Sequence, residues 1–115
     1  MGADAVVVSN HGDRQLDGTC SSIAALPRIR DSVGDRVELL VDGGIRSGQD
    51  VMRALASGAR ACLVGRAAVY GLAAGGEAGV TRAIRILGRE LDVSMALCGV
   101  SDVPAIGPDH LLAPE

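Results

Sequence analysis

The residues best suited to chemistry lie in one short polar segment, where a histidine precedes an arginine by three positions. The segment reads SNHGDRQLDG over residues 9–18 and contains His11 and Arg14. A neutral imidazole is available near pH 7 as a proton acceptor, so His11 is a candidate general base. The guanidinium of Arg14 can bind a carboxylate through two parallel hydrogen bonds. This pair predicts removal of a proton from a small acid that is held by its carboxylate.

The same segment also has a structural interpretation. A single histidine at the end of a strand can serve only to make a structural hydrogen bond, and the segment alone leaves that alternative open for His11. We expect Asn10 and Asp17 to support the loop rather than to react.

Two further segments combine glycines with an arginine. DGGIRSG covers residues 42–48, and VGRA covers residues 64–67. Glycines let the backbone approach an anion closely, and each segment leads into a predicted helix whose first amides attract anions. Together they predict a phosphate site of the kind formed after the last two strands of many TIM barrels. The alternative is that the glycines only form tight turns and that the arginines are solvated.

The elements that must position these residues alternate between strands and helices. Apolar runs predict buried strands at residues 3–9, 37–41 and 60–65. Helical patterns cover residues 21–33, 49–58 and a long region from residue 67 that glycines interrupt at 75 and 76. We expect Pro27 to open or kink the first helix and the tail after residue 100 to form loops with a short helical turn. Such βα units favour a parallel sheet, in which all three polar segments share one edge.

Composition excludes several classes of protein. The 115 residues, 48% of them hydrophobic, suffice for one globular domain, and the absence of Phe and Trp predicts a core of Val, Leu, Ile and Ala. The net charge is −3 and the basic residues are scattered arginines, which argues against nucleic-acid binding. Cys20, Cys62 and Cys98 lack the spacing of a metal or redox motif, so we expect reduced thiols and no metal. Without a signal peptide or membrane span, the expected location is cytoplasmic.

Four segments resemble a known family and together extend over nearly the whole chain. They are SNHGDRQLDG, DGGIRSGQDVMRALASGA, GRAAVYGLAAGGEAGV and MALCG. With them the chain resembles the C-terminal part of the FMN-dependent 2-hydroxy-acid dehydrogenases and oxidases, which include the L-lactate, glycolate and mandelate enzymes. The resemblance implies an α/β fold in which residues 1–115 are a partial FMN hydroxy acid dehydrogenase domain. They would supply the sixth, seventh and eighth βα units of a TIM (β/α)8 barrel, with the five N-terminal units absent.

The resemblance also implies roles for individual residues. His11 matches the histidine that accepts the hydroxyl proton of the 2-hydroxy acid, and Arg14 matches the arginine that binds its carboxylate. In the family the α-hydrogen passes to the flavin as hydride, which leaves a 2-oxo acid. Oxygen, a quinone or a cytochrome then reoxidises the flavin, and members are often homo-oligomers. The residues that match FMN-binding positions are Asp42, Gly43, Gly44, Ile45, Arg46, Gly65 and Arg66.

Asp13 departs from the family pattern, which reads His-Gly-Gly-Arg. If the family glycine has a positive φ, Asp13 is strained, although Asp tolerates such backbone better than most residues. Its carboxylate could also compete for the guanidinium of Arg14. We therefore expect Asp13→Gly to raise activity in an otherwise complete enzyme.

The N-terminal half of the family pattern is absent. With it go the substrate-side tyrosines, the aspartate that orients the histidine and the lysine near the flavin N1 locus. We therefore expect a fragment that is inactive alone and prone to aggregate through unpaired strand edges. Any membrane association would come from the absent part.

Two alternatives differ in function. One is a related FMN barrel that acts on another substrate, such as an isomerase or a peptide-modifying enzyme, although Arg14 after His11 favours a carboxylate substrate. The other is a non-catalytic remnant that binds phosphate or FMN, or that pairs with a complementary fragment.

Overall fold

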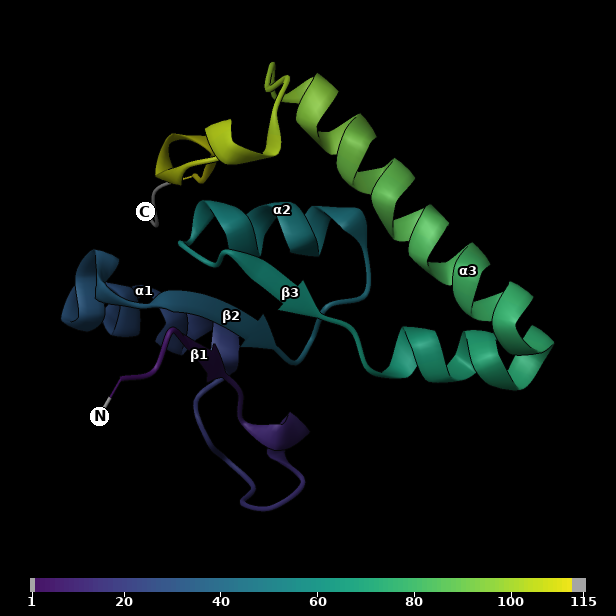
Figure 1. Ribbon diagram of the computed structural model, residues 1–115, viewed down its shortest axis with the longest axis horizontal. Helices are drawn as coiled ribbons and strands as arrows, with labels where there is room; N and C mark the ends of the chain where they lie inside the picture. Colours follow the sequence, from purple (N-terminus) through teal and green to yellow (C-terminus); the bar gives the residue numbers. More distant parts are fainter. Residues whose placement is uncertain (1, 113–115) are drawn as a thin grey trace.

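Three parallel strands in the order β1–β2–β3 form the centre of this computed structural model, which describes residues 2–112 (Figure 1). The strands are β1 (Ala5–Val8), β2 (Glu38–Asp42) and β3 (Ala61–Leu63), and the helices are α1 (Ser22–Val33), α2 (Gly48–Ala56) and α3 (Arg66–Leu97). Strand and helix alternate along the chain, as the sequence predicts. β1 and β3 are shorter than predicted, and β2 has the predicted length but begins and ends one residue later.

Residues at the ends of α1 and α2 cap or stop these two helices. The Ser21 hydroxyl accepts from the Ala24 amide at the start of α1. Pro27 lies inside α1, so the expectation that it opens this helix is wrong, because the Ser21 cap sets the start earlier. After α2, Gly58 has a φ of 108°, a conformation that suits glycine and ends the helix.

The long helix α3 consists of two arms. Gly75 and Gly76 leave helical geometry, with φ/ψ of −161°/24° and 57°/−140°, which confirms the predicted interruption. The arms form a V (Figure 1). They touch at Gly71 and Gly79, because a Cβ added to Gly79 would lie 1.9 Å from the Gly71 carbonyl oxygen.

Among residues 2–112, helices cover only one face of the sheet. On the covered face, Val8, Leu39 and Val41 pack with Leu26 of α1 and Ala54 of α2. A second cluster joins α2 to α3 and the tail, and it contains Met52, Ala56, Met95, Val100 and Ile106. On the other face, Val7 and Leu63 remain 47% and 43% exposed. Parallel sheets are normally covered on both faces, so this exposed apolar face could pack against a further layer.

The segment after α3 contains two 3-10 turns, Val103–Ala105 and Pro108–His110, where the sequence predicts one short helical turn. Residues 113–115 of the predicted loop lie outside the described residues. Over residues 2–112, no helix combines the length and apolar character needed to cross a membrane.

Candidate functional site

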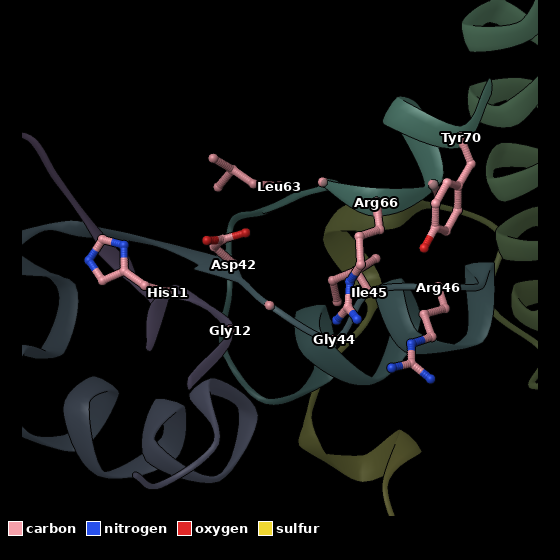
Figure 2. Close-up of a pocket in the computed structure, with 12 residues that line it drawn as sticks. His11, Gly12, Asp42, Gly44, Ile45, Arg46, Leu63, Arg66 and Tyr70 are labelled. Carbon is pink, nitrogen blue, oxygen red and sulfur yellow. The ribbon is translucent and has the colours of Figure 1, made fainter. Parts of the chain in front are cut away.

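The carboxyl ends of the three strands open into one cleft of about 570 Å³. Its lining residues are His11, Gly12, Asp42, Gly43, Gly44, Ile45, Arg46, Leu63, Gly65, Arg66, Ala67 and Tyr70. The structure thus brings His11 together with every residue predicted to bind the cofactor. Figure 2 shows His11 on one side and Arg46 and Arg66 on the other, with Asp42 and Gly44 between them.

Arg14 is the predicted site residue that does not line the cleft. It follows the 3-10 turn His11–Asp13 and is exposed. Within residues 2–112 its guanidinium takes part in no hydrogen bond or ion pair, so no protein contact holds it away from an incoming carboxylate.

The turn that carries His11 is held in the left-handed region of the backbone. His11, Gly12 and Asp13 have φ values of 53°, 67° and 58°. Asp13 therefore has a positive φ, which strains the backbone of a residue with a side chain. Asp13 Oδ1 accepts hydrogen bonds from Asn10 Nδ2, at 3.0 Å, and from the Thr19 hydroxyl. Among residues 2–112 the Asp13 carboxylate makes no contact with the Arg14 guanidinium that would compete with a substrate carboxylate. It accepts hydrogen bonds from residues of its own loop instead.

Ser9 joins this turn to the end of β2. Its hydroxyl donates to Asp42 Oδ2 at 2.8 Å and accepts from the His11 amide at 3.1 Å. Val8 pairs with Val41, so Ser9 and Asp42 follow at equivalent positions of neighbouring strands. Sequence reasoning missed this role of Ser9. The available signal was that Ser9 and Asp42 are the first polar residues after the apolar runs of two neighbouring strands.

Side chains accept hydrogen bonds from four backbone amides at the entrance to α2. Asp50 Oδ2 accepts from the Arg46 and Ser47 amides, the Ser47 hydroxyl accepts from the Asp50 amide, and Glu90 Oε2 accepts from the Gly48 amide. Partial burial by itself raises the pKa of Asp50, but the bonds from Arg46 and Ser47 and the charge of Arg53 outweigh it and leave that pKa below its ordinary value. These bonds compete with an anion for the same amides, and anion binding at the start of α2 stays a prediction.

The start of α3 differs, because no side chain in the described part of the chain caps it. Gly65 precedes the helix, and a Cβ there would meet nothing within 4 Å, so open space faces this backbone. Uncapped amides at a helix start attract anions, and Arg66 and Arg46 add two guanidinium groups on the same side of the cleft. This donor set fits a phosphate monoester such as the end of FMN.

Four lining residues were absent from the sequence predictions for the site. They are Gly12, Leu63, Ala67 and Tyr70. Tyr70 lies four positions after Arg66 on α3, a spacing that places two side chains on one helix face. Its ring points toward the side of the cleft that carries Arg46 and Arg66 (Figure 2). The spacing from Arg66, together with its being the single aromatic residue of the sequence, was the available signal.

Comparison with known proteins gives one consistent result. Residues 1–113 match the family model described as FMN-dependent dehydrogenase. An L-lactate dehydrogenase from Caulobacter vibrioides is 61% identical over 106 residues, which are 92% of this chain and 28% of the relative. An L-lactate oxidase from Nostoc sp. is 53% identical over 110 residues, 96% of this chain and 30% of the relative.

A solved structure shows the same arrangement of elements. A soluble mutant of the membrane-associated (S)-mandelate dehydrogenase from Pseudomonas putida superposes with a TM-score of 0.92 at 42% identity. The superposition covers 98% of this chain and 32% of that chain. The described chain thus spans less than a third of the length of the relatives that it matches.

Proposed function

The chain belongs to the FMN-dependent dehydrogenase family, and on that premise we propose that it contributes to an enzyme that oxidises a small 2-hydroxy acid to the 2-oxo acid. The observation that carries the proposal is the cleft that His11 lines at one side and two arginine-bearing strand ends line at the other. The relatives' names, L-lactate dehydrogenase and oxidase, support this substrate class.

FMN would bind along the cleft, with its phosphate at the start of α3. Arg66, Arg46 and the backbone at Gly65 would hold the phosphate, and Asp42, Gly43, Gly44 and Ile45 would line the adjoining chain of the cofactor. Gly43 and Gly44 have φ values of 101° and 81°, which a side-chain-bearing residue adopts only with strain. When bound, FMN supplies the acceptor for the two electrons of the oxidation.

The protein's own part in the reaction is binding and proton transfer. The His11 imidazole would accept the hydroxyl proton of the substrate, and Arg14 would hold the carboxylate. Ser9 and Asp42 fix the backbone of His11 at the mouth of the cleft. Fixing the base beside the cofactor site lowers the entropy cost of reaching the reactive geometry.

We further propose that the three βα units are the sixth to eighth of a TIM barrel. The exposed side chains of Val7 and Leu63 on the uncovered sheet face support this, because a closed barrel would bury them. The other units would supply the remaining substrate contacts. Oxygen, a quinone or a cytochrome would accept the electrons, and the complete enzyme would be a homo-oligomer.

Flavin binding and substrate bleaching test this function. The chain is purified with and without co-expression of the remaining N-terminal part of the Caulobacter L-lactate dehydrogenase, and flavin absorbance is followed on addition of L-lactate, glycolate or mandelate. We expect FMN binding by the chain alone and bleaching only in the co-expressed complex. Flavin that binds but is never bleached would favour a non-catalytic remnant, and a complex without flavin would contradict the proposal.

A further inference from the structure

The start of α2 is held against α3 by residues that lie far apart in the sequence. The Gly48 amide donates to Glu90 Oε2 at 2.8 Å. A Cβ on Gly48 would lie 2.0 Å from the Leu91 nitrogen and 2.4 Å from the Glu90 carbonyl carbon. Because any side chain at Gly48 would collide with the α3 backbone, the first turn of α2 contacts α3 directly.

This contact adjoins the loop that carries Arg46. The Arg46 and Ser47 amides each donate to Asp50 Oδ2 at 3.0 Å, and Gly48 is the next residue. The loop that carries Arg46 therefore leads into the start of α2, which two carboxylates hold in place. Asp50 holds it from within α2, and Glu90 holds it from α3.

The same helix α3 begins with Arg66, the other arginine of the cleft. Its two arms are packed together where Gly71 meets Gly79, so the arm that bears Arg66 is fixed on the arm that bears Glu90. Figure 1 shows both arms of this V, with the longer arm rising past α2. One continuous set of contacts thus connects Arg66 to Arg46 through Glu90 and Gly48.

We propose that Glu90 is a positioning residue for the phosphate end of the cleft, an inference that rests on the proposed binding of FMN. By holding α2 on α3, its carboxylate sets the spacing between Arg46 and Arg66. Together with Asp50 it also occupies the Arg46, Ser47 and Gly48 amides at the entrance to α2, which would otherwise be open to an anion. This leaves phosphate to the start of α3, where no side chain of residues 2–112 caps the helix.

Amide hydrogen exchange tests the anchoring without any ligand. In the 115-residue chain we expect Glu90→Ala to speed exchange of the Gly48 amide about tenfold, the effect of losing one hydrogen bond to a charged acceptor. Glu90→Gln keeps an oxygen acceptor, so its Gly48 amide should exchange at a rate within about threefold of that in the unaltered chain. Asp92→Ala removes an exposed carboxylate two positions after Glu90 and should leave the exchange rate of the Gly48 amide unchanged. Unchanged exchange in Glu90→Ala would overturn the proposal.

Affinity for FMN tests the positioning role. The Kd for FMN, from quenching of flavin fluorescence, should rise about tenfold in Glu90→Ala and return in Glu90→Gln. Met95→Ala, which removes a buried side chain between α2 and α3, should lower stability while the folded molecules keep their affinity. Equal losses of affinity in Met95→Ala and Glu90→Ala, or no loss in Glu90→Ala, would overturn the positioning role. An unaltered chain that binds no FMN would instead contradict the proposed function, and Gly48 exchange would still decide whether Glu90 anchors α2.

Discussion

Ser9 donates a 2.8 Å hydrogen bond to Asp42 and thereby joins the carboxyl end of β1 to that of β2. The same hydroxyl accepts from the His11 amide, so the position of the candidate base depends on a residue of the candidate cofactor segment. Such a connection lets two strand ends that are 33 positions apart act as one site.

The first prediction concerns Ser9. In an enzyme completed with the N-terminal part of a relative, Ser9→Ala should lower kcat about tenfold, because the His11 turn loses the side chain that fixes it. Steady-state turnover of L-lactate measures the effect. Ser32→Ala is the control, since among residues 2–112 the Ser32 hydroxyl bonds only to the Arg28 carbonyl on α1. Equal turnover in the two variants would show that Ser9 does not position the base.

Short-range features of the sequence predicted most of the fold. Apolar runs marked the strands, and two adjacent glycines marked the break in α3, because both signals act within a few residues. The cleft was foreseeable because ends of parallel strands meet at one edge. The bond from Gly48 to Glu90 spans 42 positions and depends on how α2 packs on α3, which no local pattern encodes. The competition of Glu90 with an anion at the start of α2 was therefore not foreseeable from the sequence.

The second prediction concerns Asp13. Because its carboxylate binds Asn10 and Thr19, removing its charge should leave the binding of substrate by Arg14 unaffected. We expect Asp13→Asn, which keeps an oxygen acceptor and tolerates a positive φ, to change KM by less than about twofold. A fall in KM would show that the charge does compete for Arg14. The expected gain of activity in Asp13→Gly now rests only on relief of the φ of 58°.

The third prediction concerns the acid stability of α2. The pKa of Asp50 lies below its ordinary value of 3.8 in the folded chain, so its ionised form favours folding above that pH. This stabilisation should be lost as the pH falls below about 3.8 toward the folded pKa. Asp50→Asn should therefore cost about 1 kcal/mol of stability at pH 6, a typical helix-capping contribution, and less at pH 3.

Urea unfolding of both chains across this pH range measures that difference. Asp92→Asn controls for the change in net charge. The Asp92 carboxylate is exposed, and within residues 2–112 it makes no hydrogen bond or ion pair. If the difference in free energy of unfolding between Asp50→Asn and the unaltered chain stays constant from pH 6 to pH 3, the prediction is contradicted.

The last prediction uses the thiols as probes of the sheet. Cys62 lies in β3 opposite Val41, and burial raises its pKa from 9.0 to about 11, whereas Cys20 and Cys98 are exposed. At pH 8 this shift lowers the thiolate fraction of Cys62 about a hundredfold relative to an ordinary thiol. Alkylation with iodoacetamide, followed by peptide mass spectrometry, should therefore label Cys20 and Cys98 well before Cys62. In 6 M urea, where the sheet is lost, all three should react at similar rates. Rapid labelling of Cys62 in the folded chain would mean that β3 does not pair with β2 as described, and the Gly65–Arg66 end of the cleft would lose its support.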